Sequence, residues 1–327
     1  MNIVPISDQD HLAHLDSILP DDVRTFSLGT IDGPAGGELR GAIVNGSRMV
    51  SQMRANHGLG IPETLVLGHA YMGAALMAST LKGEDRINIA VQCDGPAEGF
   101  SVEGRAIPSI GESPGGVAVR GRIFNNAIVL DKAPDSFDTA PFVGAGSITV
   151  VRHIEGMRQP FTGTTKLHSG RLSQDLAVYY LESEQTHTAF RFSIQFDRAG
   201  RVAGAGGIYL QAMPNALPET LSRAEERLAA MPTLGAWLAQ GGDPDNLIEH
   251  YFNLLGPTML ARLDVGFDCP CSKERIGSFL KSSEPAFLVE MAEKGPWPIE
   301  TTCHNCGSVY LFERDEIEAM RSQRSGD

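Results

Sequence analysis

The chain has 327 residues, 42% of them hydrophobic, which suggests two or three folding units with a sizeable core in at least one. Its formal net charge of −13 at pH 7 argues against a chain-wide nucleic-acid-binding surface, although a small basic patch remains compatible with it. The N-terminal residues lack a basic region followed by an apolar run, and no apolar stretch approaches the length of a membrane span. We therefore expect a soluble, cytoplasmic protein that binds neither nucleic acid nor membrane.

Residues 1–215 alternate helix-like and strand-like patterns without an internal repeat, which predicts one large α+β domain of mixed sheet and helix. Apolar residues at helical spacing predict three helices, over residues 41–57, 65–81 and 172–183. Period-two patterns predict four strands, over residues 87–93, 117–122, 147–153 and 190–196. Hairpin-like turns between them favour a largely antiparallel sheet. The glycine-rich stretch 204–214 is interpreted as a turn that enters a strand, with tight backbone packing rather than phosphate binding.

The character of the chain changes after Pro214, where short amphipathic segments are separated by glycine and proline. Helical spacing predicts three short helices, over residues 217–231, 234–238 and 244–255. Asp243 and Pro244 suit the N-cap and first turn of the third helix. Because helices of about ten residues are marginal in isolation, their order depends on neighbouring packing. We predict a metastable helical linker over residues 216–266, with an ordinary helical subdomain as the alternative.

Four of the five cysteines form two close pairs near the C-terminus, Cys269 with Cys271 and Cys303 with Cys306. Sulfur atoms of cysteines two or three positions apart in a turn can converge on a tetrahedral zinc ion, whose ligands lie at about 2.3 Å. The pairs therefore predict one Zn²⁺ held by four thiolates, with buried or disulfide-bonded cysteines as the alternative. His304 is not needed as a ligand because four cysteines complete the shell. Clustered rather than distributed cysteines also favour a reducing compartment.

Residues 267–327 contain few large apolar side chains, and a domain of only about sixty residues usually needs a staple to stay folded. Residue patterns predict helices over 272–280, 285–292 and 315–321 and a strand over 309–312. Gly295 is the expected C-cap of the second helix. We therefore predict a small C-terminal zinc-binding domain that unfolds when the metal is lost.

Besides a protein whose C-terminal domain unfolds when its metal is lost, two other classes of function are considered. A structural zinc ribbon in an interaction or nucleic-acid-binding protein is the main alternative, and the acidity of the chain counts against it. The histidines are scattered without metal-ligand spacing and no Gly-x-Ser-x-Gly motif occurs, so we do not expect an enzyme. The isolated Cys93 is interpreted as a small buried core residue, with a resolving-thiol role as the alternative.

The cysteine motifs resemble those of the redox-regulated chaperones of the heat-shock protein 33 family. Residues 268–275, Asp-Cys-Pro-Cys-Ser-Lys-Glu-Arg, are similar to the family's first signature, and 303–306 with 310–312 resemble its second pair and the following strand. Lys273 stands where the family often has arginine, and Pro296-Trp297-Pro298 replaces a shorter, more polar turn, which predicts a stiffer loop. Further upstream matches are Arg40-Gly41, Asp94-Gly95-Pro96, Val143-Gly144, Ser183-Glu184-Gln185 and residues 206–214.

The resemblance implies an N-terminal α/β core, a helical linker and a C-terminal zinc domain. It implies an ATP-independent holdase that is inactive when reduced and zinc-bound. On this reading, oxidants with unfolding conditions release zinc, form the disulfides Cys269–Cys271 and Cys303–Cys306, and unfold the linker. The exposed surface would bind unfolded client proteins. The resemblance also implies a monomer when reduced and a homodimer when oxidised.

Overall fold

The computed structural model describes residues 9–29, 37–109, 111, 115–130, 136–214 and 216–324. The chain packs into two compact units, a core unit formed by Ile6–Phe267 and a C-terminal unit that contains Asp268–Asp327. Both combine helices with strands, so the predicted α+β class is confirmed. In the part of the chain that the structure describes, no helix is both long enough and apolar enough to cross a membrane.

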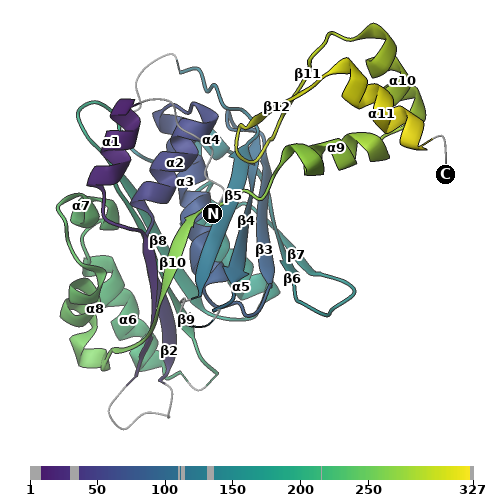
Figure 1. Cartoon of the computed structure of the whole chain (residues 1–327). Helices are drawn as coiled ribbons and strands as arrows, with labels where there is room; N and C mark the ends of the chain where they lie inside the picture. The colour runs from purple at the N-terminus through teal and green to yellow at the C-terminus, as the bar shows by residue number, and fades with distance from the viewer. Residues whose placement is uncertain are drawn as a thin grey trace. The chain divides into compact units, whose positions relative to one another are not determined.

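A single ten-stranded sheet organises the described residues of the core unit (Figure 1). Its neighbouring strands are antiparallel, apart from the parallel pair β10 and β5, which confirms the predicted largely antiparallel sheet. Across the sheet the strands are β7 (Phe161–Lys166), β6 (Gly146–His153), β3 (Arg86–Cys93), β4 (Gly99–Ile107), β5 (Gly116–Ile123), β10 (Thr258–Phe267), β1 (Asp22–Leu28), β2 (Leu39–Asn45), β9 (Val202–Ala212) and β8 (Thr188–Phe196).

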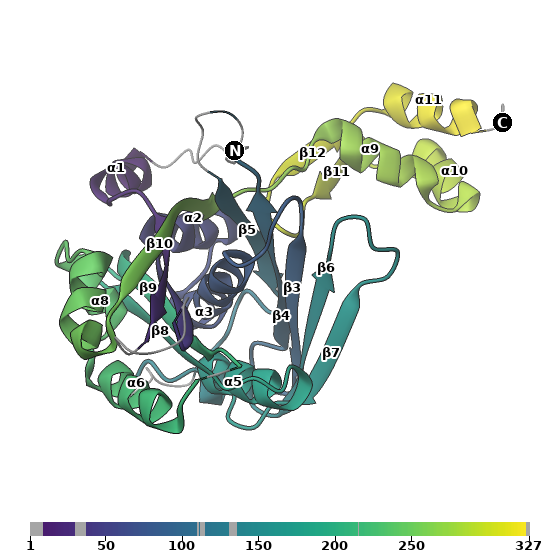
Figure 2. The same ribbon diagram turned by 90° about the horizontal axis from the view of Figure 1, so that it is seen from below.

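Helix α3 (Ile61–Ala78) packs inside the curve of the sheet (Figure 2). The Tyr71 hydroxyl donates to the Gly121 carbonyl of β5 at 2.9 Å, and a Cβ on Gly104 of β4 would lie 2.6 Å from the Ala74 carbonyl. This close approach explains why the strand carries glycine there. The other helices of this part of the chain are α1 (Gln9–Ser17), α2 (Ser47–His57), α4 (Ala140–Val143) and α5 (Leu172–Ser183).

Three short helices cover the opposite face of β1, β2 and β9: α6 (Pro218–Ala230), α7 (Leu234–Ala239) and α8 (Pro244–Phe252). Adjacent glycines of β9 mark the two faces, because a Cβ on Gly206 would meet Leu238 of α7, whereas one on Gly207 would approach Leu76 of α3. A short 3₁₀ turn, η1 (Asn253–Leu255), follows α8. The three predicted helices are thus present and packed on the sheet, and their separate melting as a linker stays a prediction.

Two of the predicted elements are wrong in part. The expected helix over 41–57 begins only at Ser47, because residues up to Asn45 form β2. From Gly41 to Asn45 both faces of β2 are buried, so its apolar residues do not alternate and such a run resembles a helix. The glycines of 204–214 lie within β9 rather than in a turn. Tight packing there is confirmed, since a Cβ on Gly204 would lie 2.2 Å from the Gly235 carbonyl of α7.

The residue patterns also miss several strands, namely β1, β4, β7, β10 and, in the C-terminal unit, β11 (Ile299–Thr302). β10 lies within the predicted linker, yet it pairs with β1 on one side and with β5 on the other. The first five residues of β10 are exposed, so its sequence lacks the alternation of a half-buried strand. Pairing to distant strands makes it part of the core sheet.

The C-terminal unit surrounds a two-stranded antiparallel hairpin with three helices: α9 (Lys273–Ser282), α10 (Pro285–Lys294) and α11 (Arg314–Arg324). The second strand, β12 (Val309–Phe312), has the predicted bounds, and the Gly295 C-cap of α10 is also confirmed. Its small apolar cluster consists of Leu280, Leu288, Met291, Ala292, Phe312 and Ile317, with Ile276, Ile299, Tyr310 and Met320 at the edge. No cysteine belongs to this cluster.

Candidate metal centre

The second cysteine pair lies in the loop of the β-hairpin. β11 and β12 are the two arms, and Cys303 and Cys306 fall between them. The Gly307 N–H donates to the Cys303 carbonyl at 2.8 Å. Gly307 has a φ of +72°, a left-handed value that glycine adopts without strain. This tight loop holds the sulfur atoms of its two cysteines within 4.8 Å of each other.

The first cysteine pair directly precedes a capped helix. The Ser272 hydroxyl accepts a hydrogen bond from the Arg275 N–H at 3.2 Å, which fixes the start of α9 just after Cys271. The Arg275 guanidinium donates to the Pro270 carbonyl at 2.9 Å and so holds the residue between the two cysteines.

The structure brings all four predicted cysteines together. Their sulfur atoms lie within 4.8 Å of one another, and three of the four residues are buried. Cys269 Sγ is 3.8 Å from Cys303 Sγ, and Cys271 Sγ is 3.3 Å from Cys306 Sγ. Four sulfur ligands placed tetrahedrally at about 2.3 Å from an ion would lie about 3.8 Å apart. The donor set and its spacing therefore fit a tetrahedral metal site of thiolates.

The two cysteines of the hairpin loop differ in acidity. Hydrogen bonds with Cys269 and Cys306 lower the pKa of Cys303 to about 3. Sulfur contacts with Cys269 and Cys303, together with burial, raise the pKa of Cys306. Of the two hairpin cysteines, Cys303 therefore ionises more readily than Cys306. Because four thiolates this close repel one another, the cluster can lose all its protons only around a cation.

Two hydroxyl side chains that we did not predict as site residues contact the sulfurs. The Tyr310 hydroxyl donates to Cys271 Sγ at 3.0 Å, and the Cys306 thiol donates to Ser308 Oγ at 3.2 Å. Burial and the hydrogen bond to Cys271 raise the pKa of Tyr310, so its hydroxyl remains a donor. Ser308 follows Cys306 closely in sequence, which is the signal that would identify it, whereas Tyr310 is 39 residues from Cys271 and carries no such signal.

The remaining candidate residues fall outside the cluster. His304 is exposed, and it is not among the four grouped ligand-type residues. Cys93 ends β3 in the core unit and is half-buried rather than buried as predicted. Burial raises the pKa of its thiol, which makes it a weak nucleophile near neutral pH.

The two departures from the family pattern both have contacts within the C-terminal unit. Lys273 Nζ lies 2.7 Å from a Glu316 carboxylate oxygen and 5.3 Å from the centroid of the Phe312 ring. In the Pro296-Trp297-Pro298 segment, the guanidinium carbon of Arg314 lies 4.8 Å from the centroid of the Trp297 ring, within cation–π range. Both departures therefore attach α9 or the β11 entry to the start of α11.

The fold and the cysteine cluster define a class of protein: an α+β core joined to a small unit whose four thiols are compatible with a metal site. The Hsp33 protein family matches residues 34–313. A match of this extent shows that the chain belongs to the Hsp33 family of chaperones.

Individual relatives agree with this membership. The chain is 32% identical over 289 residues to a 33 kDa chaperonin of Geobacter sulfurreducens, with 87% of this chain and 91% of that protein covered. It is 30% identical over 290 residues to a 33 kDa chaperonin of Levilactobacillus brevis, with 88% and 95% covered. Both relatives are named as chaperonins rather than enzymes, which is consistent with the expectation of a non-enzyme.

A solved structure extends the similarity to three dimensions. The crystal structure of the 33 kDa chaperonin, a heat shock protein 33 homologue, from Thermotoga maritima matches with a TM-score of 0.79 at 26% identity. The match covers 94% of this chain and 99% of that one. The similarity therefore includes residues of both compact units.

Proposed function

We propose that the protein is an ATP-independent holdase chaperone that is switched by oxidation of its clustered cysteines. In the reduced protein, Cys269, Cys271, Cys303 and Cys306 hold one zinc ion as thiolates, and the chaperone is inactive. The observation that carries the proposal is the gathering of four thiols around one point in a unit with little apolar core. Membership of a chaperone family supports the holding activity.

When bound, zinc would supply the positive charge that allows four thiolates to share one small volume. Cys269 and Cys271 would hold it from the start of α9, while Cys303 and Cys306 would hold it from the hairpin loop. Metal binding then joins two segments that lie far apart in sequence. Structural zinc sites contribute about 10–16 kcal/mol of apparent binding free energy at neutral pH, more than a small domain's usual stability. The fold of the C-terminal unit therefore depends on its thiolates.

Oxidation removes these thiolates in pairs. With peroxide as the oxidant, a thiolate attacks the O–O bond, becomes a sulfenic acid and releases hydroxide. The second cysteine of the pair displaces water from that sulfur and closes the disulfide, so each pair passes two electrons to one peroxide. The proposed disulfides are Cys269–Cys271 and Cys303–Cys306. Sulfur contacts at 3.8 and 3.3 Å join the two pairs in the structure, and forming disulfides within each pair would break these contacts.

Loss of the C-terminal fold is proposed to release segment 216–266, which holds α6–α8 and most of β10, from the rest of the core unit. The short helices α6–α8 bury apolar side chains against β1, β2 and β9. Their release would expose Phe26, Leu28 and Ile208, all of which are buried in the structure. Such a face would bind the apolar segments of unfolded client proteins and would also favour a homodimer of the oxidised form. A reducing cytoplasm would keep the resting protein inactive.

The test follows zinc, thiols and client holding in one reaction. Reduced, zinc-loaded protein is treated with peroxide at raised temperature while a chromogenic chelator reports zinc, a thiol reagent counts cysteines and light scattering follows a denatured client. We expect suppression of aggregation to appear together with zinc release and loss of the clustered thiols, and peptide mapping to recover the two local disulfides. Cys93→Ser is the matched control and should behave like the wild type. Full zinc release without any holding would contradict the proposal.

A further inference from the structure

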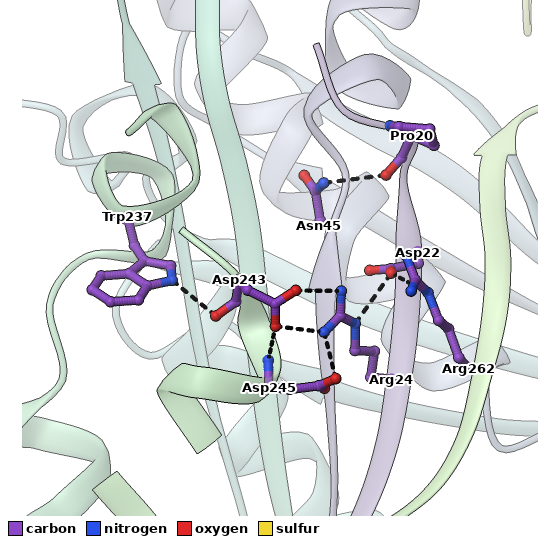
Figure 3. A network of polar contacts seen from close by, with 8 residues as sticks. All are labelled: Pro20, Asp22, Arg24, Asn45, Trp237, Asp243, Asp245 and Arg262. Carbon is purple, nitrogen blue, oxygen red and sulfur yellow. Dashed lines mark hydrogen bonds and ion pairs between the residues drawn. The ribbon is translucent and has the colours of Figure 1, made fainter. Parts of the chain in front are cut away.

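A buried arginine joins the helical segment to the core sheet (Figure 3). Arg24 lies on β1 with only 6% of its side chain exposed. Its guanidinium makes a two-pronged contact with the Asp243 carboxylate, at 2.8 and 3.2 Å. It also lies 2.7 Å from Asp245 Oδ2. Asp243 and Asp245 belong to the start of α8, so this one side chain bridges strand and helix.

The carboxylates that Arg24 contacts are held by a rigid turn. Asp243 is the N-cap of α8, and its Oδ1 accepts the Asp245 N–H at 2.7 Å. Before it, the turn folds over Trp237 of α7, whose indole N–H donates to the Asp243 carbonyl at 3.1 Å. A Cβ on Gly242 would lie 2.3 Å from Trp237 Nε1, so the turn packs closely on the ring. Arg24 therefore contacts carboxylates that are fixed in the turn between α7 and α8, so it holds both helices and not merely one flexible side chain.

A third carboxylate extends the contacts to another strand. Asp22 Oδ2 accepts from Arg24 Nε at 3.1 Å and lies 2.6 Å from Arg262 Nε of β10. The Asp22 side chain is only 4% exposed, and its Oδ1 has no hydrogen-bond partner among the described residues. Such a carboxylate depends on neighbouring cations for compensation. We call Asp22, Arg24, Asp243, Asp245 and Arg262 together the Arg24 ion-pair network.

We propose that the Arg24 ion-pair network holds α7 and α8 on the core sheet and sets how readily they detach. Detachment must separate Arg24 from Asp243 and Asp245, which breaks the charge-assisted contacts to the helix and leaves only Asp22 beside the guanidinium. Burial opposes the charge of Arg24, but hydrogen bonds with the two carboxylates outweigh it and raise its pKa. Arginine cannot relieve that charge by losing a proton. This proposal rests on the proposed function in one respect only, namely that detachment of the helices exposes the client-binding face.

The test removes the helix-side charges without removing the helix cap. Asparagine is as good an N-cap as aspartate, so Asp243→Asn with Asp245→Asn preserves the start of α8. In the reduced, zinc-loaded full chain we expect amide hydrogen exchange in α7 and α8 to become about tenfold faster, which corresponds to about 1.4 kcal/mol. Zinc content and exchange in α9, α11 and β12 should stay unchanged.

A matched control removes an exposed ion pair from the same helical segment. Arg223 and Glu219 on α6 lie 2.7 Å apart with side chains 55% and 75% exposed, so Arg223→Gln should change exchange by less than about twofold. Arg24→Met attacks the network from the sheet side and should reproduce the double variant. If Arg24→Met does not fold, the Asp243→Asn, Asp245→Asn protein decides alone. Exchange in its α7 and α8 no faster than in Arg223→Gln would overturn the proposal.

A second readout separates this inference from the proposed function. In the peroxide assay, the Asp243→Asn, Asp245→Asn protein should hold clients at lower temperature than the wild type. If its α7 and α8 exchange faster but no oxidised form holds clients, the role of the network stands and the holdase mechanism fails. If exchange is unchanged while the wild type still holds clients after oxidation, the network proposal fails and the proposed function stands.

Discussion

The two compact units are stabilised by different physical means. In the core unit, β1, β2 and β9 are covered by helices on both faces, so burial of apolar surface dominates. The C-terminal unit has a small apolar cluster, and its first residues meet the β11–β12 hairpin loop at four thiols. Burial does not depend on the redox state of the solution, whereas thiolate coordination does. One chain thus combines an apolar core with a small unit built around four thiols, whose fold we propose to depend on sulfur chemistry.

Metal removal should have the largest effect, because it should unfold the C-terminal unit and leave the core unit folded. Chelation from the reduced protein under native conditions should abolish exchange protection in β12 and α11, since it removes about 10–16 kcal/mol of binding free energy. Strands β2 and β9 should keep their protection. Hydrogen exchange with mass spectrometry measures both regions in one sample. Retention of β12 protection after complete zinc loss would mean that the apolar cluster suffices.

Gly204→Ala should break the packing that distinguishes the core unit. The added Cβ would lie 2.2 Å from the Gly235 carbonyl and 2.6 Å from the Ala239 nitrogen of α7, and these backbone atoms cannot rotate away. We expect destabilisation of about 3 kcal/mol and loosening of α7, measured by urea unfolding. The control is Gly73→Ala in α3, where the nearest atom would lie at 3.4 Å and helix propensity improves. Equal stability of the two variants would contradict this account.

Asp21 is a polar exception within the core unit, and it predicts a pH effect. Its carboxylate accepts the Arg48 and Met49 N–H groups at 2.9 and 2.6 Å and so caps α2 from a distant segment. Burial raises its pKa from 3.8 to about 7, despite these two hydrogen bonds. Between about pH 4 and about pH 7 the folded state therefore keeps a proton on Asp21 that the unfolded state has lost. The stabilising contribution of this protonated carboxyl declines as pH rises through that range.

Asp21→Asn isolates this titration because asparagine keeps an acceptor but has no proton to lose. The stability of the wild type relative to Asp21→Asn should fall with pH across that window, by up to about 1.4 kcal/mol per pH unit. Urea unfolding of both proteins at matched pH values measures the difference, which cancels contributions from other titrating groups. A difference that is constant with pH would show that Asp21 is ionised throughout.

Tyr310→Phe should produce the smallest effect, and it tests how a hydroxyl beside the cysteine cluster changes the reactivity of the thiols. Its hydroxyl donates to Cys271 Sγ, and loss of such a bond is worth about 1 kcal/mol. Because the donor stabilises negative charge on sulfur, its removal should speed peroxide oxidation of the cluster a few-fold, as followed by thiol counting. Tyr251→Phe in α8 removes a hydroxyl from the core unit instead and should leave the rate unchanged. Slower oxidation in Tyr310→Phe would reverse the assigned role of the hydroxyl.

Much of the site could be predicted because its determinants are local. The cysteine pairs, the Ser272 cap of α9 and the Asp243 cap of α8 each involve residues within a few positions of one another. Short hydrogen bonds of this kind appear directly as residue spacing. The hydroxyl of Tyr310 was missed because its contact with Cys271 crosses the unit and leaves no local pattern.

The core sheet was less predictable because its strands depend on distant partners. β2 resembles a helix in sequence, and only burial between β1 and β9 makes it a strand. Arg24 carries no sequence signal for its role either, since its carboxylate partners Asp243 and Asp245 come from a distant helix.

The sequence by itself determined the chemistry of this protein: four cysteines in two turns, beside capped helices, in a unit too small to rely on apolar burial. Side-chain type and close spacing settle these properties before any long-range contact forms. Only the tertiary structure decided that β10 completes the core sheet, that glycines of β9 admit α7, and that Arg24 joins strand to helix. Those features need contacts between segments far apart in the chain. The free energy of such a contact depends on the residues of both segments together, so neither segment specifies it alone.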